Sequence, residues 1–158
     1  MTEEQTGETK PTAEPLADKQ QQFRQAWLQC LMDNLKASLP EAAFSQVMEA
    51  CGRGCARRNA APLIAQANGN LDTLLSSFGA AIGAGNVSRE GNQYHLRYPQ
   101  CYCPIVAAGP ARLPDAWCEC GRGFVLEAFS AVAGKPVTVE LTQSIKRGDP
   151  QCHFVVWV

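Results

Sequence analysis

The sequence lacks long apolar runs and clusters of positive charge. The stretch nearest to a membrane span, residues 78–84, is much shorter than the roughly 18 residues that a bilayer requires, and glycine interrupts it. No run of lysine and arginine is longer than two residues, as in Arg57–Arg58, and the formal net charge of the 158 residues is −1. A nucleic-acid-binding stripe and a polybasic membrane patch are therefore excluded, and we expect neither nucleic acid nor a membrane as a partner.

Recognisable targeting and catalytic signals are also missing. The N-terminus begins Met-Thr-Glu-Glu-Gln and has neither the basic nor the apolar segment of a secretory signal, so we expect a cytoplasmic protein with reduced cysteines. No Ser-His-Asp arrangement, phosphate-binding loop or paired-carboxylate motif stands out. Residues 1–18 are polar and without periodicity, which predicts a disordered tail before a single domain at residues 19–158.

The hydrophobic period is helical in the first half of the chain and changes to that of strands after Asn86. Apolar residues recur every four positions in the first helix, at Phe23, Trp27, Leu31 and Leu35. The predicted helices are residues 19–39, 40–61, 63–67, a segment from 71 to the glycines at 79–85, and 116–132.

Two hairpins flank the last of these helices, residues 116–132. Asp115 is expected to cap the N-terminus of this helix. Alternating apolar residues predict the hairpins at 87–98 and 137–158. His95 alternates with apolar neighbours, which indicates a solvent-facing or hydrogen-bonded histidine and not a metal ligand. We expect an α+β fold in which the helical N-terminal half packs on an antiparallel sheet of two hairpins with an intervening helix.

What the chain does have is cysteine, eight in all, of which Cys30 stands alone. In a reducing compartment, closely spaced cysteines indicate a metal-binding or redox-active site before they indicate disulfides. The other seven lie in four short segments: Cys51-Gly-Arg-Gly-Cys55, Cys101-Tyr-Cys103, Cys118-Glu-Cys120 and Cys152.

Cys101 and Cys103 lie two residues apart at the end of a strand, so both thiols are expected on one face, with Tyr102 on the other. Cys118 and Cys120 lie in the first helical turn, where backbone N–H groups and the helix dipole favour thiolate over thiol. Because a regular helix separates them by about 200°, only one is expected to point into a given site. Cys152 is expected on the inward face of the last strand.

Cys51 and Cys55 share a helical face with Phe44, Val47 and Met48, so packing in the core and ligand binding both remain open for them. Gly52 and Gly54 between them cost roughly 1 kcal/mol each in a helix. Close backbone packing or the approach of a ligand would explain their presence.

Residues 86–158 resemble the 4-vinyl reductase domain family. The matching segments are Cys118-Glu-Cys-Gly-Arg-Gly-Phe124, Val137-Thr-Val-Glu140 after Gly134, and Gly148-Asp-Pro-Gln-Cys152-His-Phe154. The last segment is also similar to the end of the family resembling L-2-amino-thiazoline-4-carboxylic acid hydrolase. The resemblance implies the α+β fold and a pocket for small hydrophobic or tetrapyrrole-like molecules.

The resemblance also implies a zinc held by cysteines and a glutamate beside that pocket. By position, Cys118 and Cys152 look like two of its ligands, and Glu140 lies near the acidic one. Ser144 stands where the family has another cysteine, so Cys120, Cys101 or Cys103 would replace the missing thiol. The expected zinc ligands are Cys103, Cys118, Cys120 and Cys152.

We therefore expect a small-molecule-binding domain whose ligand is small and either hydrophobic or thiol-reactive. The alternative is a thiol-dependent or metal-dependent hydrolase with Cys118 or Cys120 as nucleophile. A third interpretation is a cysteine-rich structural or partner-binding protein, and a homodimer is compatible with each. The predicted pocket residues are Cys51, Cys55, Cys101, Cys103, Cys118, Cys120 and Cys152.

Overall fold

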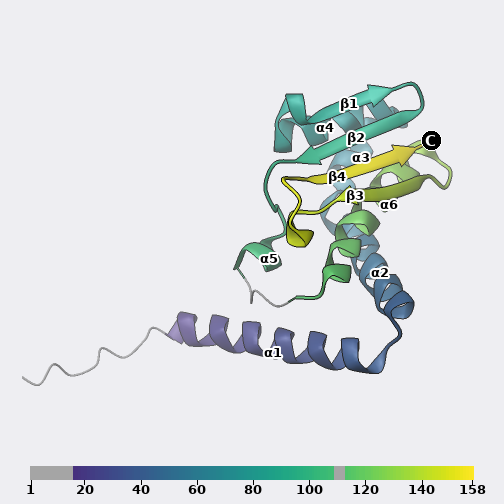
Figure 1. Cartoon of the computed structure of the whole chain (residues 1–158). Helices are drawn as coiled ribbons and strands as arrows, with labels where there is room; N and C mark the ends of the chain where they lie inside the picture. The colour runs from purple at the N-terminus through teal and green to yellow at the C-terminus, as the bar shows by residue number, and fades with distance from the viewer. Residues whose placement is uncertain (1–15, 109–112) are drawn as a thin grey trace, which may run out of the picture.

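Helices and strands follow one another in the predicted order in the computed structural model, which describes residues 16–108 and 113–158 (Figure 1). Residues 1–15 of the predicted tail and residues 109–112 lie outside these ranges. Residues 16–18, also predicted as tail, are helical, and a short helix at Pro104–Ala108 was not predicted. The helices are α1 Leu16–Ser38, α2 Glu41–Asn59, α3 Ala61–Ala67, α4 Leu71–Ile82, α5 Pro104–Ala108 and α6 Glu119–Ala133. The strands are β1 Val87–Glu90, β2 Gln93–Tyr98, β3 Thr138–Gln143 and β4 Cys152–Trp157, and single 3-10 turns lie at Ala84–Asn86, Asp115–Cys118 and Ile145–Arg147.

The four strands form one antiparallel sheet in the order β1-β2-β4-β3. The two predicted hairpins are joined through β2 and β4, where Leu96 pairs with Phe154. Leu96, Phe154 and Val156 point to the helices and form the main core with Phe78 of α4 and Phe129 of α6. The predicted α+β fold, with the helical half packed on the sheet, is confirmed.

The first half of α1 extends away from the rest of the molecule (Figure 1). Phe23 and Trp27 are 69% and 58% exposed, so the N-terminal half of the apolar stripe of α1 is not buried. Leu31 and Leu35 do pack, against a second and smaller core around Phe44 and Trp117. Among the described residues, none of the helices combines the length and the apolar character needed to cross a bilayer.

Helices α2 and α6 cross with their backbones in contact, and glycine makes this possible on both sides. A Cβ atom on Gly52 would lie 1.9 Å from the carbonyl oxygen of Cys120, and one on Gly123 would lie 2.1 Å from that of Glu49. Gly54 has only the Arg58 side chain nearby, at 3.6 Å. Close backbone packing therefore explains Gly52 but not Gly54.

The buried face of α2 differs from the predicted one. It consists of Phe44, Met48, Gly52 and Ala56, spaced four residues apart and turned toward α6. Val47 and Cys51, which were expected on it, are exposed. The helix presents its glycine because only a residue without a side chain fits against the α6 backbone.

The start of α6 also departs from expectation. Residues Asp115–Cys118 form a 3-10 turn, and the α-helix begins only at Glu119. The side chain of Asp115 makes no capping hydrogen bond; its carboxylate lies 3.7 Å from Nζ of Lys146. This turn alters the directions of Cys118 and Cys120, which matters for the site.

Candidate functional site

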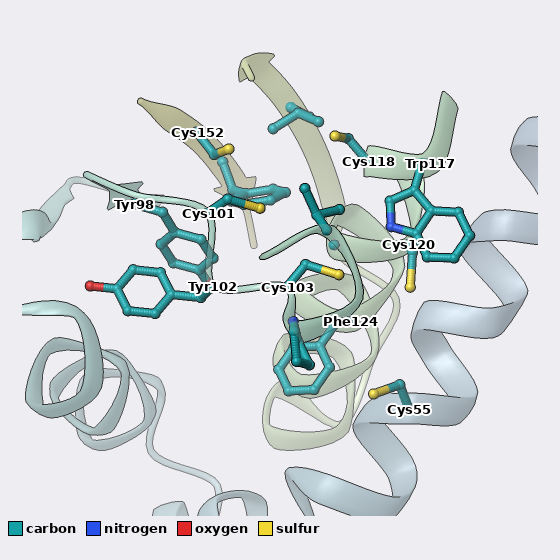
Figure 2. A pocket seen from close by; sticks show the side chains of 15 residues that line it. Cys55, Tyr98, Cys101, Tyr102, Cys103, Trp117, Cys118, Cys120, Phe124 and Cys152 are labelled. Atoms are coloured by element: carbon teal, nitrogen blue, oxygen red, sulfur yellow. The ribbon is translucent and has the colours of Figure 1, made fainter. Parts of the chain in front are cut away.

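A cavity of about 300 Å³ opens where the first turns of α6 meet the ends of β2, β3 and β4 and the side of α2 (Figure 2). Its walls are largely apolar, and none of the described side chains that line it is an acid, a lysine, an arginine or a histidine. Its volume lies at the small end of the range for ligand pockets, about 300–1,000 Å³. The lining residues are Cys55, Tyr98, Cys101, Tyr102, Cys103, Pro104, Val106, Trp117, Cys118, Cys120, Gly121, Phe124, Leu141, Cys152 and Phe154.

Six of the seven predicted pocket cysteines line this cavity, although they come from four separate segments of the chain. The seventh, Cys51, is exposed and lies outside it, as does the isolated Cys30. Cys55, one turn further along α2 than Cys51, contributes to the wall. All eight thiols are free.

Two geometric expectations about the thiols are wrong. Cys118 and Cys120 both line the cavity, because Cys118 belongs to the 3-10 turn and the angular spacing of a regular helix does not apply. Tyr102 lines the cavity together with Cys101 and Cys103, because β2 ends at Tyr98 and the chain that follows is not an extended strand.

One end of the cavity holds Cys118 and Cys152 around the fully buried Ser144. The Ser144 hydroxyl donates to Sγ of Cys118 over 3.2 Å, and the backbone N–H of Ile145 donates to Sγ of Cys152 over 3.4 Å. Asp149 fixes this turn by accepting from the backbone N–H of Ser144 at 2.7 Å. Ser144, which stands where the resemblance implies a cysteine, thus bonds to a neighbouring thiol.

Burial raises the pKa of Cys118, Cys120 and Cys152, and neighbouring thiols raise it further. For Cys120 the pKa rises to about 11, with Cys103 and Cys55 as the nearest contributors after burial. The hydrogen bond from Ser144 lowers the pKa of Cys118 but does not overcome the desolvation of the thiolate. The expectation that the helix N-terminus favours thiolate at Cys118 and Cys120 is therefore wrong, and both residues are neutral thiols at pH 7.

The raised pKa of Cys120 predicts that this thiol is alkylated slowly in the native protein. At pH 8 its thiolate fraction in the native protein is expected to be on the order of a hundredfold below that in denatured protein, because burial disfavours the anion. Iodoacetamide labelling followed by peptide mass spectrometry measures this ratio, with the exposed Cys30 as internal control. Equal labelling rates of Cys120 in native and denatured protein would contradict a buried, neutral thiol.

The four expected zinc ligands divide between the two cores. Cys118 and Cys152 pack against the main core, whereas Cys103 and Cys120 pack against the smaller one. Within residues 16–108 and 113–158, no three Cys, His, Asp or Glu side chains are arranged to hold a metal ion together. The arrangement as it stands does not fit a zinc centre, and a bound zinc stays a prediction.

His95 lies away from the cavity, on the sheet face opposite the helices. Its Nδ1 is 3.1 Å from Nε2 of His153, so it is hydrogen-bonded as expected. Burial, then Arg97 and His95, lower the pKa of His153, which favours its uncharged form.

The residues that sequence reasoning missed are the aromatic walls. Tyr98, Tyr102, Trp117, Phe124 and Phe154 line the cavity between the thiols (Figure 2). The rings of Tyr98 and Phe154 contact one another in a tilted arrangement, with centroids 5.3 Å apart and an interplanar angle of 59°. The alternation of apolar residues predicted that Tyr98 and Phe154 face inward. Nothing in the sequence, however, distinguishes a residue of a cavity wall from an ordinary core residue.

Solved structures that share this fold include the following two. A trafficking protein particle complex subunit 3 from Naegleria fowleri, covalently bound to palmitic acid, has 16% identity and a TM-score of 0.58 over 89% of this chain and 95% of its own. The phenol-responsive sensory domain of the transcription activator PoxR, solved with phenol, has 19% identity and a TM-score of 0.56 over 84% of this chain and 73% of its own. At these identities the likeness shows the fold.

The search of curated proteins finds no match. A family defined by sequence, however, covers residues 10–157, nearly the whole chain. The chain belongs to this family of unknown function, DUF6144.

Proposed function

We propose that this protein is a binding domain that holds a small, largely apolar molecule in the cysteine-lined cavity. The observation that carries the proposal is the cavity itself, a hollow of about 300 Å³ walled by aromatic rings and thiols inside a small domain. Well-packed proteins leave few voids larger than a water molecule, so an apolar hollow of this size favours a ligand site.

The chemistry of the walls favours this ligand class. Neutral thiols behave as small, polarisable hydrophobes, and sulfur makes favourable contacts with aromatic rings. A charged ligand would lose its hydration without meeting an opposite charge among the described lining residues. The two solved structures of the same fold, which contain palmitic acid and phenol, support a small-molecule ligand.

The same observations favour binding over thiol catalysis. A nucleophilic cysteine needs thiolate character at working pH, and burial raises the pKa of Cys118, Cys120 and Cys152. A base that would deprotonate them is missing from the described walls, since no histidine or carboxylate lines the cavity. We therefore propose a noncovalent complex.

A fragment screen by protein-observed NMR tests the proposal. Neutral aromatic and aliphatic fragments are expected to perturb resonances of the lining residues, such as Phe124 and Leu141, and to compete with one another. The His95–His153 pair on the opposite sheet face serves as an internal reference that should not respond. Fragments that bind only elsewhere, or a complete absence of hits, would overturn the proposal.

A further inference from the structure

Trp117 brings an unused hydrogen-bond donor to the cavity. Its side chain lines the cavity, the residue is 6% exposed, and Nε1 has no hydrogen-bond partner. Figure 2 shows the ring nitrogen on the edge of the indole that faces the other labelled side chains. Buried tryptophan N–H groups usually find a partner, so this one calls for an explanation.

The indole is held in this orientation by packing on its other side. Trp117 belongs to the smaller core, where Met32, Phe44, Met48 and Leu113 are buried with it. Its position in the 3-10 turn is fixed by a 2.9 Å bond from its backbone N–H to the carbonyl of Pro114. The ring therefore cannot turn toward solvent without disrupting that core.

Two of the thiols at the cavity already have hydrogen-bond partners. Sγ of Cys118 accepts from Ser144, and Sγ of Cys152 accepts from the backbone of Ile145. Two cations lie nearby, Lys146 beside Asp115 and Arg147 on the carbonyl of Leu141, but neither is part of the wall. Nε1 of Trp117 is thus a buried donor without a partner, and an indole N–H can only donate, whereas the hydroxyls of Tyr98 and Tyr102, which also line the cavity, can donate and accept.

We propose that the ligand is an uncharged, largely aromatic molecule whose oxygen, in a carbonyl or hydroxyl group, accepts a hydrogen bond from Nε1 of Trp117. This inference rests on the proposed function and adds the chemical class of the ligand. The rings of Tyr98, Phe124 and Phe154 contact the flat part of the molecule, while its oxygen points to the indole.

Three probes of nearly the same shape separate the parts of this proposal. Acetophenone carries a carbonyl oxygen, α-methylstyrene replaces that oxygen with a methylene group, and benzoate adds a negative charge. Their dissociation constants are measured by ligand-observed NMR titration against the wild-type protein and Trp117→Phe. Phenylalanine keeps an apolar ring in the smaller core and removes the donor; because its ring is smaller than an indole, α-methylstyrene controls for the change of shape.

Trp117→Phe is expected to weaken acetophenone binding roughly three- to tenfold, the value of one hydrogen bond between neutral groups. Binding of α-methylstyrene should stay within about twofold, and benzoate should bind neither protein. Equal losses for the ketone and the hydrocarbon would show that Trp117 acts by shape alone and overturn the inference. Benzoate binding as tightly as acetophenone would overturn the uncharged ligand class.

A wild-type measurement covers the case in which Trp117→Phe does not fold. The protein has three tryptophans, Trp27, Trp117 and Trp157, and their indole N–H resonances separate in a ¹⁵N correlation spectrum. Acetophenone is expected to shift the Trp117 indole proton far more than α-methylstyrene does. Equal shifts would again overturn the inference, whereas failure of both neutral probes to bind would overturn the proposed function itself.

Discussion

Gly52→Ala is expected to destabilise the protein by about 3 kcal/mol, which corresponds to a fall in Tm of about 6–12 °C. The added methyl group would lie 1.9 Å from the carbonyl oxygen of Cys120 and 2.9 Å from the backbone nitrogen of Phe124. Backbone atoms cannot move aside as a flexible side chain does, so α2 and α6 would have to separate. The gain of about 1 kcal/mol in helix propensity does not offset this.

Gly54→Ala is the matched control, two residues further along the same helix. Its methyl group would meet only the Arg58 side chain, at 3.6 Å. We expect it to stabilise the protein by roughly 0.5–1 kcal/mol through helix propensity alone. Chemical denaturation measures both variants, and equal effects of the two substitutions would contradict the close crossing of α2 and α6.

Gly121→Leu is expected to reduce ligand affinity by more than about tenfold, because the new side chain enters the cavity from α6. Gly121 lines the cavity, and a Cβ atom there would lie 3.1 Å from Cζ of Phe154. The stability cost of this contact, about 1–3 kcal/mol, is partly offset by the better helix propensity of leucine. The variant should therefore fold while losing its binding site.

Gly54→Leu controls for introducing leucine into a helix, since Gly54 does not line the cavity. Titration of acetophenone into both variants, with the Tm of each recorded, gives the comparison. Undiminished binding by folded Gly121→Leu would place the ligand outside this cavity.

The order of elements was predictable because local signals agree with the tertiary structure. Asn70, for example, directly precedes the predicted helix that begins at residue 71, asparagine favours the N-cap position, and its side chain accepts from the backbone N–H groups of Asp72 and Thr73. The buried face of α2 was not predictable in the same way. Whether Gly52 or Cys51 faces α6 depends on how closely two backbones approach, and hydrophobic periodicity does not record that distance.

For the site, cysteine clustering identified six residues that the fold brings together from distant segments. The clustering carried no information on which core each thiol joins, and Cys103 and Cys120 pack with the residues around Trp117. The sequence also suggested thiolates at Cys118 and Cys120, because it predicts that they lie at a helix N-terminus but does not reveal how deeply they are buried. In the structure, desolvation by burial raises the pKa of both Cys118 and Cys120.

The role of Trp117 lay beyond sequence reasoning for a related reason. Its place directly before Cys118 was visible, but an unpaired N–H group is a property of the packed structure. The same holds for Ser144, whose bond to Cys118 depends on the turn before β4.

The central claim is that the cysteines line an apolar cavity that accepts small uncharged molecules, and residue-resolved thiol labelling tests it most directly. Neutral methyl methanethiosulfonate and its anionic sulfonatoethyl analogue are compared at Cys103 and Cys120, with exposed Cys30 as reference. We predict that the neutral reagent is favoured at the two cavity cysteines by about tenfold or more relative to Cys30, and that denaturation removes this preference. The same ratio of rates at Cys103, Cys120 and Cys30 in the native protein would contradict the claim.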